Sequence, residues 1–455
     1  MVGAGHGQRP ERRVEAVQKA PTSSRKAYRR VSTWWHVSRD DALMEGRELE
    51  RAALDRMPLL DEACDTGGAF VLDEEAPEDT TADVGDGWAV EVSSGSRVVV
   101  ARGSRANSAE QAHALGIDAA QRGLDLLSIR NLGDHRIRRA DDENLVWWPD
   151  GDQRVLRACS IASLRIDVPS VTVRITDASG KEKPRPAEPE PVWHPSFRFF
   201  RLAQVSEEVF DAYRNLYLAL ESILSTASPH KPGEREKDWI GRALREAEAK
   251  GMNLAAFAAP GAVDPADSIR QELYSDTRTA TFHAKVGAPT LLPLDAVDRR
   301  AVLASLSRLA GLYLDLVQRT LGVRRPSGGM FRPGFDMLIG NIVEELQIHV
   351  TDDPIPMQKT DTVINPGGGL VKPLATRAAP ELDQAFLRNC IGEAPVEELR
   401  ELTHVARVVA TTADGSLISG GQLEGRLTLG GFDRFQAAMG IRGVNVRPPR
   451  SFYPL

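Results

Sequence analysis

The sequence predicts an α+β protein of several domains, in which a central antiparallel helical bundle is flanked by two mixed α+β units. Three observations lead to this fold class. A chain of 455 residues exceeds the size of one typical core. Amphipathic helical periodicity occupies the middle of the chain, and strand-like alternation occupies both flanks. Apolar residues at 42% and charged residues at 27% are ordinary for a globular protein.

Changes in composition place the expected domain boundaries. A disordered basic tail over residues 1–32 precedes an N-terminal α+β domain at 33–180. A proline-rich linker at 181–195 leads to the helical bundle at 196–325, and a C-terminal α+β region covers 326–455. Prolines interleaved with charges favour extended polyproline conformations, so we expect the linker to be a semi-stiff spacer.

The flanks show hairpin signals. The runs Trp88–Val92 and Arg97–Ala101 contain β-branched residues and are separated by a short serine- and glycine-containing turn, which predicts a hairpin. Ser108 is expected to cap a helix that ends near Leu127. Further along the chain, Val405–Thr412 and the run that begins at Leu423 predict a second hairpin about an Asp-Gly turn.

The middle of the chain predicts helices from their caps and their apolar stripes. The first is expected to begin at Ser206, the second covers Glu236–Lys250, the third opens at Asp264 with a proline next to it, and the fourth covers Asp295–Leu321. Apolar residues recur at three- and four-residue spacing, which is typical of amphipathic helices that pack together. The stripe expected to join the third and fourth helices consists of Ile269, Leu273, Leu303, Leu306 and Ala310.

Composition and missing signatures limit the classes of function. A net charge of −7 argues against a large surface that coats nucleic acid. No uninterrupted apolar run approaches the roughly 20 residues that span a bilayer, and the basic tail lacks the apolar core of a secretory signal. Three widely separated cysteines fit a reducing compartment, so we expect a cytoplasmic protein.

The sequence lacks the common cofactor and metal signatures. It contains no glycine-rich loop followed by Lys-Ser or Lys-Thr, no His-Glu-x-x-His and no cysteine pair at metal spacing. We therefore expect no cofactor, no metal and no dinucleotide. The run Asn365–Gly369 offers backbone N–H groups to an anion, but it is interpreted as a flexible turn.

One segment contains candidate catalytic residues, Arg278-Thr-Ala-Thr-Phe-His283 in the third helix. Cleaving RNA without metal needs a group that moves the 2′-hydroxyl proton and a cation that holds the phosphate. Histidine suits the first task and arginine the second. The alternative interpretation is an exposed arginine, paired with Asp276 or Glu272, and a histidine that favours the helix dipole. On a regular helix the two side chains diverge by roughly 140°.

The helices also resemble a known family. The block from Ser206 to Leu321, with Arg278-x4-His283 and an upstream helix that carries Glu221, resembles a HEPN domain. Together with the segment Trp193–Phe200 it is similar to ApeA-like and methylamine-utilisation MauJ-like proteins. The resemblance implies a metal-independent ribonuclease or RNA-binding protein that works as a homodimer in stress or defence. In that role Arg278 would hold the phosphate, His283 would move the proton and Glu221 would orient Arg278.

Two other functions stay open from the sequence. The first is a non-catalytic dimerisation or interaction scaffold, which net acidity and the threonine at position 279 favour. The second is an accessory protein of methylamine utilisation, which rests on the family label alone. RNA and a second copy of the chain are thus the expected partners.

Overall fold

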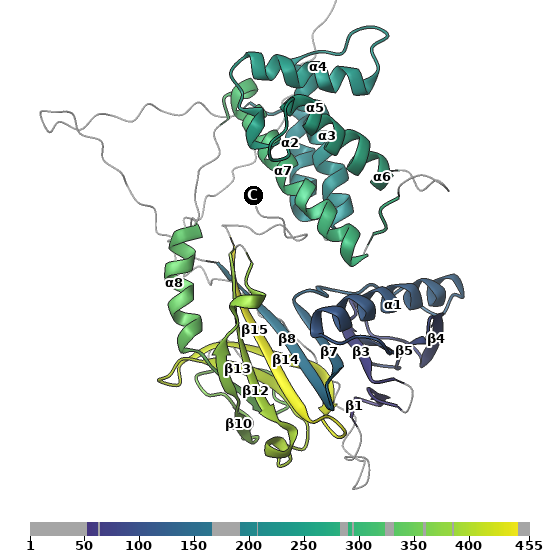
Figure 1. Ribbon diagram of the computed structural model, residues 1–455, viewed down its shortest axis with the longest axis vertical. Helices are drawn as coiled ribbons and strands as arrows, with labels where there is room; N and C mark the ends of the chain where they lie inside the picture. The colour runs from purple at the N-terminus through teal and green to yellow at the C-terminus, as the bar shows by residue number, and fades with distance from the viewer. Residues whose placement is uncertain are drawn as a thin grey trace, which may run out of the picture. The chain divides into compact units, whose positions relative to one another are not determined.

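The computed structural model describes residues 52–61, 64–165, 192–206, 208–282, 290–293, 295–323, 332–357, 361–384 and 386–444 (Figure 1). The predicted tail at 1–32 and most of the predicted linker lie outside these residues. Up to residue 165 the elements are β1 (Ala53–Leu54), β2 (Met57–Pro58), β3 (Thr66–Val71), β4 (Thr80–Gly85), β5 (Trp88–Val92), β6 (Val98–Gly103), α1 (Ala109–Ile129), β7 (Glu143–Asp150) and β8 (Gln153–Arg165).

The remaining elements fall into a helical part and a second β part. The helical part contains α2 (Pro195–Val205), α3 (Val209–Ala227), α4 (Glu236–Ala249), η1 (Leu254–Ala256), α5 (Pro265–Arg270), η2 (Gln271–Arg278), α6 (Thr279–Phe282) and α7 (Ala296–Leu321). The second β part contains α8 (Arg332–Glu345), β9 (Gln347–Thr351), β10 (Val371–Pro373), β11 (Ala375–Ala378), η3 (Pro380–Leu382), β12 (Leu387–Pro395), η4 (Val396–Leu399), β13 (Val405–Thr411), β14 (Leu417–Thr428) and β15 (Arg434–Val444).

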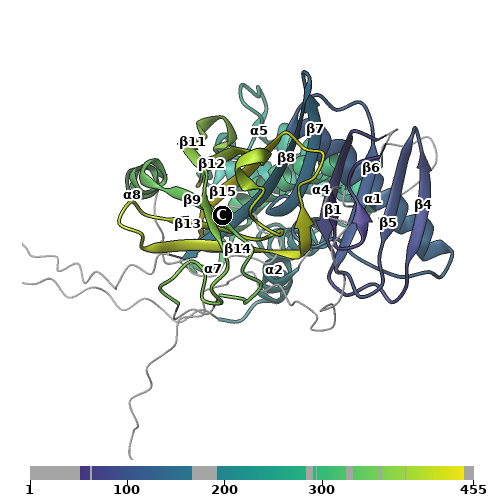
Figure 2. The same cartoon turned by 90° about the horizontal axis from the view of Figure 1, so that it is seen from below.

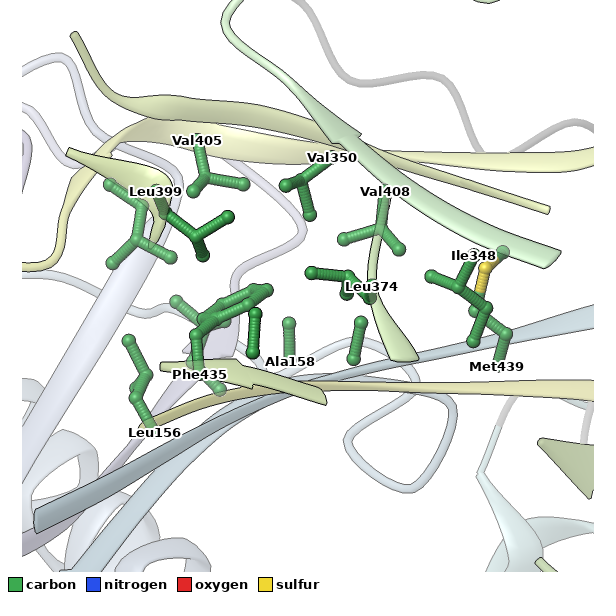
Figure 3. Packing of buried hydrophobic residues seen from close by; sticks show 14 of the residues in the cluster. Leu156, Ala158, Ile348, Val350, Leu374, Leu399, Val405, Val408, Phe435 and Met439 are labelled. Carbon is green, nitrogen blue, oxygen red and sulfur yellow. The ribbon is translucent and has the colours of Figure 1, made fainter. Parts of the chain in front are cut away.

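Two large sheets organise the β parts. Among the described residues, one sheet has six strands in the order β10-β9-β13-β14-β1-β2, and the other has nine in the order β11-β12-β15-β8-β7-β3-β6-β5-β4 (Figure 2). Each sheet therefore joins a block of strands from the C-terminal part of the chain to a block from the N-terminal part. Side chains of β9 and β13 point toward those of β8 and β15, and these form the core between the two sheets (Figure 3).

The nine-stranded sheet is buried on both faces where α1 covers it. In β6, Val98 and Val100 pack into the core between the sheets, whereas Val99 and Ala101 belong to the core beneath α1. This explains why the strand is an uninterrupted apolar run rather than an alternating one. The predicted hairpin is confirmed, since β5 and β6 pair antiparallel, and α1 is capped as expected by Ser108.

The predicted fold class is wrong. The described chain is a mixed α/β protein built on two large sheets, not a central helical bundle flanked by two α+β units. Strand β15 pairs in parallel with β8 from Arg434↔Val155 to Val444↔Arg165 (Figure 1), so both flanks contribute to one sheet. Local periodicity detects strands and amphipathic helices, but it does not reveal which strands pair across a long separation.

The helices between Pro195 and Leu321, called here the helical region, pack around an apolar core of their own. Asp264 caps α5 with Pro265 next to it, Asp295 caps α7, and Gly322 at φ +69° ends it, all as predicted. The predicted start at Ser206 is wrong. A helix already runs from Pro195, and Ser206 is its C-cap, while Glu208 caps α3.

Helix α7 contains a long apolar stretch. By length and composition, Val297–Leu321 is apolar enough to cross a membrane, at a mean hydropathy of 1.2, although the sequence shows no uninterrupted apolar run. Half of its most apolar 18-residue stretch is buried, and Leu309 and Leu312 lie in the core of the helical region. The core helix of a folded domain meets the same criterion, and we interpret α7 in that way.

The stripe predicted to join the third and fourth helices is confirmed. Ile269, Leu273, Leu306 and Ala310 are buried in one core, and Leu303 packs against it. Because Leu306 is fully buried, we expect Leu306→Ala to lower the free energy of unfolding by about 2–5 kcal/mol. Urea denaturation measures this change. Val297→Ala on the exposed side of α7 is the control and should cost less than about 0.5 kcal/mol. Equal effects of the two substitutions would contradict the packing.

Three carboxyl side chains among the described residues of the β parts are buried, Glu143 on β7, Asp353 after β9 and Glu424 on β14. The Glu424 side chain is 5% exposed, and its nearest cation is loosely placed, with 3.9 Å between Arg97 Nη1 and Glu424 Oε1. A cavity of about 20 Å³ beside it is also lined by Asn144. Burial raises the pKa of Glu424 to about 7, against the opposing effect of Arg97.

The raised pKa of Glu424 makes stability depend on pH. The folded state binds this proton more tightly than the unfolded chain, so the free energy of unfolding falls as pH rises from about 4.5 through about 7. Glu424→Gln should remove this fall and stabilise the protein at pH 8 by at most about 3 kcal/mol. Denaturation at pH 5 and pH 8 tests it, with the exposed Glu398→Gln as control. A wild-type and an E424Q protein with the same pH slope would refute the assignment.

Candidate functional site

The site is built on an irregular helix. Helix α5 continues into the π-helix η2, which ends at Arg278, before the chain returns to α-helix in α6. The Tyr213 hydroxyl on α3 donates to the Leu273 carbonyl at 2.8 Å, and Thr279 Oγ1 donates back to the Tyr274 carbonyl at 3.0 Å. Both hydroxyls thus donate hydrogen bonds to backbone carbonyls of the π-helix η2. π-Helical turns are rare and often lie at functional sites.

Arg278 projects from the end of η2 into a ring of aromatic side chains. Its Cζ lies 4.9 Å from the ring centroid of Tyr274, 5.4 Å from that of Phe282 and 5.7 Å from that of Tyr217. The Arg278 side chain is 21% exposed. The guanidinium is therefore partly withdrawn from water and stabilised by the faces of aromatic rings.

Two carboxyl groups complete the site. Arg278 Nη2 donates to both oxygens of Glu236 at 3.2 Å, and the Tyr274 hydroxyl donates to Glu236 Oε2 at 3.4 Å. Burial, followed by the hydrogen bond and charge of Glu236, raises the pKa of Glu221 to about 8, against the opposing effect of Arg278. The raised pKa favours the protonated Glu221 carboxyl at neutral pH, and this carboxyl is hydrogen-bonded to Glu236.

This arrangement is close to neutral in charge. The Arg278 cation is balanced by Glu236, and Glu221 adds no charge while it is protonated. Burial raises the pKa of Tyr217, whose hydroxyl is buried without a hydrogen-bond partner among the described residues. The site thus holds one fixed guanidinium, one proton donor at Glu221 and a ring of aromatic faces.

The structure brings together some of the predicted site residues. Glu221 and Arg278 lie in one cluster, as expected if Glu221 helps to orient the arginine. His283 lies outside the described residues, so its convergence with Arg278 stays a prediction. Asp276 and Glu272, named as alternative partners of Arg278, bind other groups instead. Asp276 accepts from Gln271 at 2.7 Å, and Glu272 accepts from Arg308 Nε at 2.8 Å.

Sequence reasoning missed Glu236. Its position in the first turn of α4 has an ordinary explanation, because an anion there favours the helix dipole. It lies 42 residues from Arg278, and nothing in the local pattern connects the two. Only the packing of α4 and α5 beside α3 brings them together.

The glycine run at Asn365–Gly369 does bind carboxylates, but they belong to the chain itself. The Gly367 N–H donates to Asp353 Oδ2 at 2.6 Å, and the Leu370 N–H donates to Asp352 Oδ1 at 2.7 Å. Asp353 is fully buried, and a Cβ at Gly367 would clash with it. The run is therefore an anchored loop rather than a flexible turn.

The cysteine thiols and the possible metal ligands among the described residues do not form a second candidate site. The three cysteines are free thiols, and burial raises the pKa of Cys159 and of Cys390 to about 12. Among the described residues, no three His, Cys, Asp or Glu side chains gather as metal ligands do. The Arg278 cluster is thus the candidate site.

Comparison with family models, curated proteins and solved structures finds no match for this chain. The resemblance to HEPN domains therefore stays a prediction from residues and spacing.

The proton on Glu221 gives the site a pH dependence. Because its pKa is raised in the folded state, its contribution to stability is complete below about pH 4.5 and is lost as pH rises through about 8. Glu221→Gln keeps the hydrogen bond to Glu236 without a titrating group, so its unfolding should depend less on pH between 5 and 9. Thermal melts across that range measure this, with the exposed Glu248→Gln on α4 as control. If E221Q leaves the dependence of the melting temperature on pH unchanged, the raised pKa of Glu221 is contradicted.

Proposed function

We propose that the protein is a HEPN-like cytoplasmic protein that acts on RNA without metal, as a homodimer, in stress or defence. The observation that carries the proposal is the Arg278 guanidinium, which is partly exposed and held at the end of a π-helix by Glu236 and aromatic rings. A guanidinium fixed in this way loses little freedom when it binds a phosphate.

Arg278 keeps donors for a phosphate. Arginine has five N–H groups, and Glu236 accepts from Nη2 alone. Among the described residues the Arg278 Nε–H is buried without an acceptor, so Nη1 and the remaining Nη2 hydrogen are the donors left for a phosphate. A phosphate that approaches the exposed side can therefore share the guanidinium with Glu236. Glu221 acts as a positioning residue, because its proton holds the Glu236 carboxylate beside Arg278.

The proposed reaction is transesterification within RNA. His283, taken from the sequence, removes the proton of the 2′-hydroxyl, and the 2′ oxygen bonds to the adjacent phosphorus. The bond from phosphorus to the 5′ oxygen breaks, and that oxygen takes up the proton that the imidazolium returns. The products are a 2′,3′-cyclic phosphate and a 5′-hydroxyl. Arg278 stabilises the charge that develops on the phosphate.

A second function is favoured by the ion pair itself. Arg278 already has a carboxylate partner in Glu236, and aromatic rings cover much of its guanidinium. An arginine that is paired with a carboxylate and packed against aromatic rings can also stabilise the fold without any catalytic role. In that case the helical region is a dimerisation or interaction scaffold, and Arg278 contributes to stability alone.

RNA cleavage separates the two functions. We expect the purified protein to cleave transfer RNA or total RNA in EDTA, and Arg278→Ala and His283→Ala to reduce the rate by about 10²- to 10⁴-fold. Gel analysis with end-group assignment measures the rate and identifies the cyclic phosphate. Arg245→Ala, at an exposed arginine of α4, should cleave as the wild type does.

Two results reject catalysis. In the first, the wild type and the two variants cleave RNA at equal rates. In the second, the wild type does not cleave RNA under any of these conditions. If Arg278→Ala also lowers the melting temperature, the scaffold function is the better account.

A further inference from the structure

A second surface of the helical region exposes an aromatic ring beside cations. Trp193, just before α2, is 64% exposed, and the Arg198 guanidinium lies 5.8 Å from the centroid of its ring. Arg201, one turn further along α2, is also exposed. The segment from Val192 to Ser206 contains no acidic residue, in a chain whose net charge is −7.

The backbone that carries Trp193 is fixed by its neighbours. The His194 ring contacts Ser196 Oγ at 2.8 Å and Thr226 Oγ1 at 2.9 Å, so α2 begins against the C-terminal turn of α3. The Tyr313 hydroxyl on α7 donates to Ser196 Oγ at 3.1 Å. These bonds orient α2 so that its apolar side is buried and Trp193 remains on the surface. Arg198 lies over the indole, and Trp193 is still 64% exposed.

The loop between α3 and α4 connects this surface with the Arg278 site. It follows Thr226, which contacts His194, and it ends at Glu236, which binds Arg278. Exposed cations along the loop and the start of α4 are Lys231, Arg235 and Lys237, and none of them forms an ion pair among the described residues.

The acidic residues of this loop are mostly neutralised. Arg242 binds Glu234 at 2.8 Å and also donates to the Pro229 carbonyl at 2.9 Å, so the loop is held in shape. Glu236 is paired with Arg278, and Asp238 is the remaining exposed acid. The exposed residues Trp193, Arg198, Arg201, Lys231, Arg235 and Lys237, which lie just before and on α2, on the loop and at the start of α4, are called here the basic path. The contact of His194 with Thr226 places the start of α2 beside the start of the loop.

We propose that single-stranded RNA lies along the basic path, with one base stacked on Trp193 and its phosphates against the path's cations, and so reaches the Arg278 site. The choice of RNA rests on the proposed function. A stacking ring flanked by arginines is the combination by which proteins hold unpaired nucleotides. A duplex keeps its bases stacked on one another and offers none to Trp193.

Fluorescence anisotropy with a 5′-fluorescein 12-nucleotide single-stranded RNA tests the inference on the full chain. Trp193→Ala should weaken binding by about 5- to 100-fold, the effect of one lost base stack. The double variant R198Q/R201Q should lower the slope of log Kd against log salt by about 1.4, since each lost phosphate contact removes about 0.7. Ile129→Ala and Arg130→Gln, both exposed at the end of α1, should bind as the wild type does.

The outcomes distinguish this inference from the proposed function. Binding that depends on Trp193 without any cleavage supports the path and rejects catalysis at Arg278. Cleavage that needs Arg278, with binding unchanged in W193A and R198Q/R201Q, supports catalysis and overturns the path. A wild type that binds no single-stranded RNA, or binds duplex RNA equally well, also overturns it. A thermal melt of each variant confirms that it is folded.

Discussion

The parallel pairing of β8 with β15 is the contact on which the architecture depends. It joins strands that begin 281 positions apart, at Gln153 and Arg434, along the full length of β15. Without it, the nine-stranded sheet would separate into β11-β12-β15 and the six strands from β8 to β4. The second link, between β14 and β1, places strands from both chain ends in the other sheet as well. These two links bring together the two sheet faces that enclose the core. The helical region is inserted in the chain between β8 and α8.

Local elements could be predicted from the sequence, whereas the long-range links could not. Ser108, Asp295 and Gly322 mark helix ends through bonds that each residue makes with its own neighbours. The β5–β6 hairpin follows from a short turn between two apolar runs. By contrast, nothing in the residues of β8 distinguishes β15 from β14 as a partner, since all three strands carry apolar residues of similar kind. The early start of the first helix at Pro195 was missed because its cap is His194, a residue not typical of that position.

In the candidate site, too, some features could be predicted from the sequence and others could not. Arg278 was identified because arginine suits a chemical role, and Glu221 from its place on the flank of the upstream helix; both lie in the cluster. The π-helix was not anticipated, since a regular period of 3.6 residues was assumed through the whole third helix. Its wider turns change the direction in which the side chains of α6 project relative to those of α5. The divergence of about 140° between positions 278 and 283 applies to a regular helix, and position 283 lies outside the described residues.

Charge connects the site to the basic path. The Arg278 cluster is nearly neutral at pH 7, because Glu236 balances the arginine and burial keeps a proton on Glu221. A phosphate is therefore attracted weakly by the cluster alone, and more weakly still above about pH 8, where Glu221 gains its charge. In the proposed function the attraction comes from the cations of the basic path. Lys231 and Arg235 lie on the loop that leads to Glu236, and Lys237 follows Glu236 on α4. Under the proposed function, the Arg278 cluster orients one guanidinium toward the phosphate, and the basic path supplies the charge that attracts it to an acidic protein.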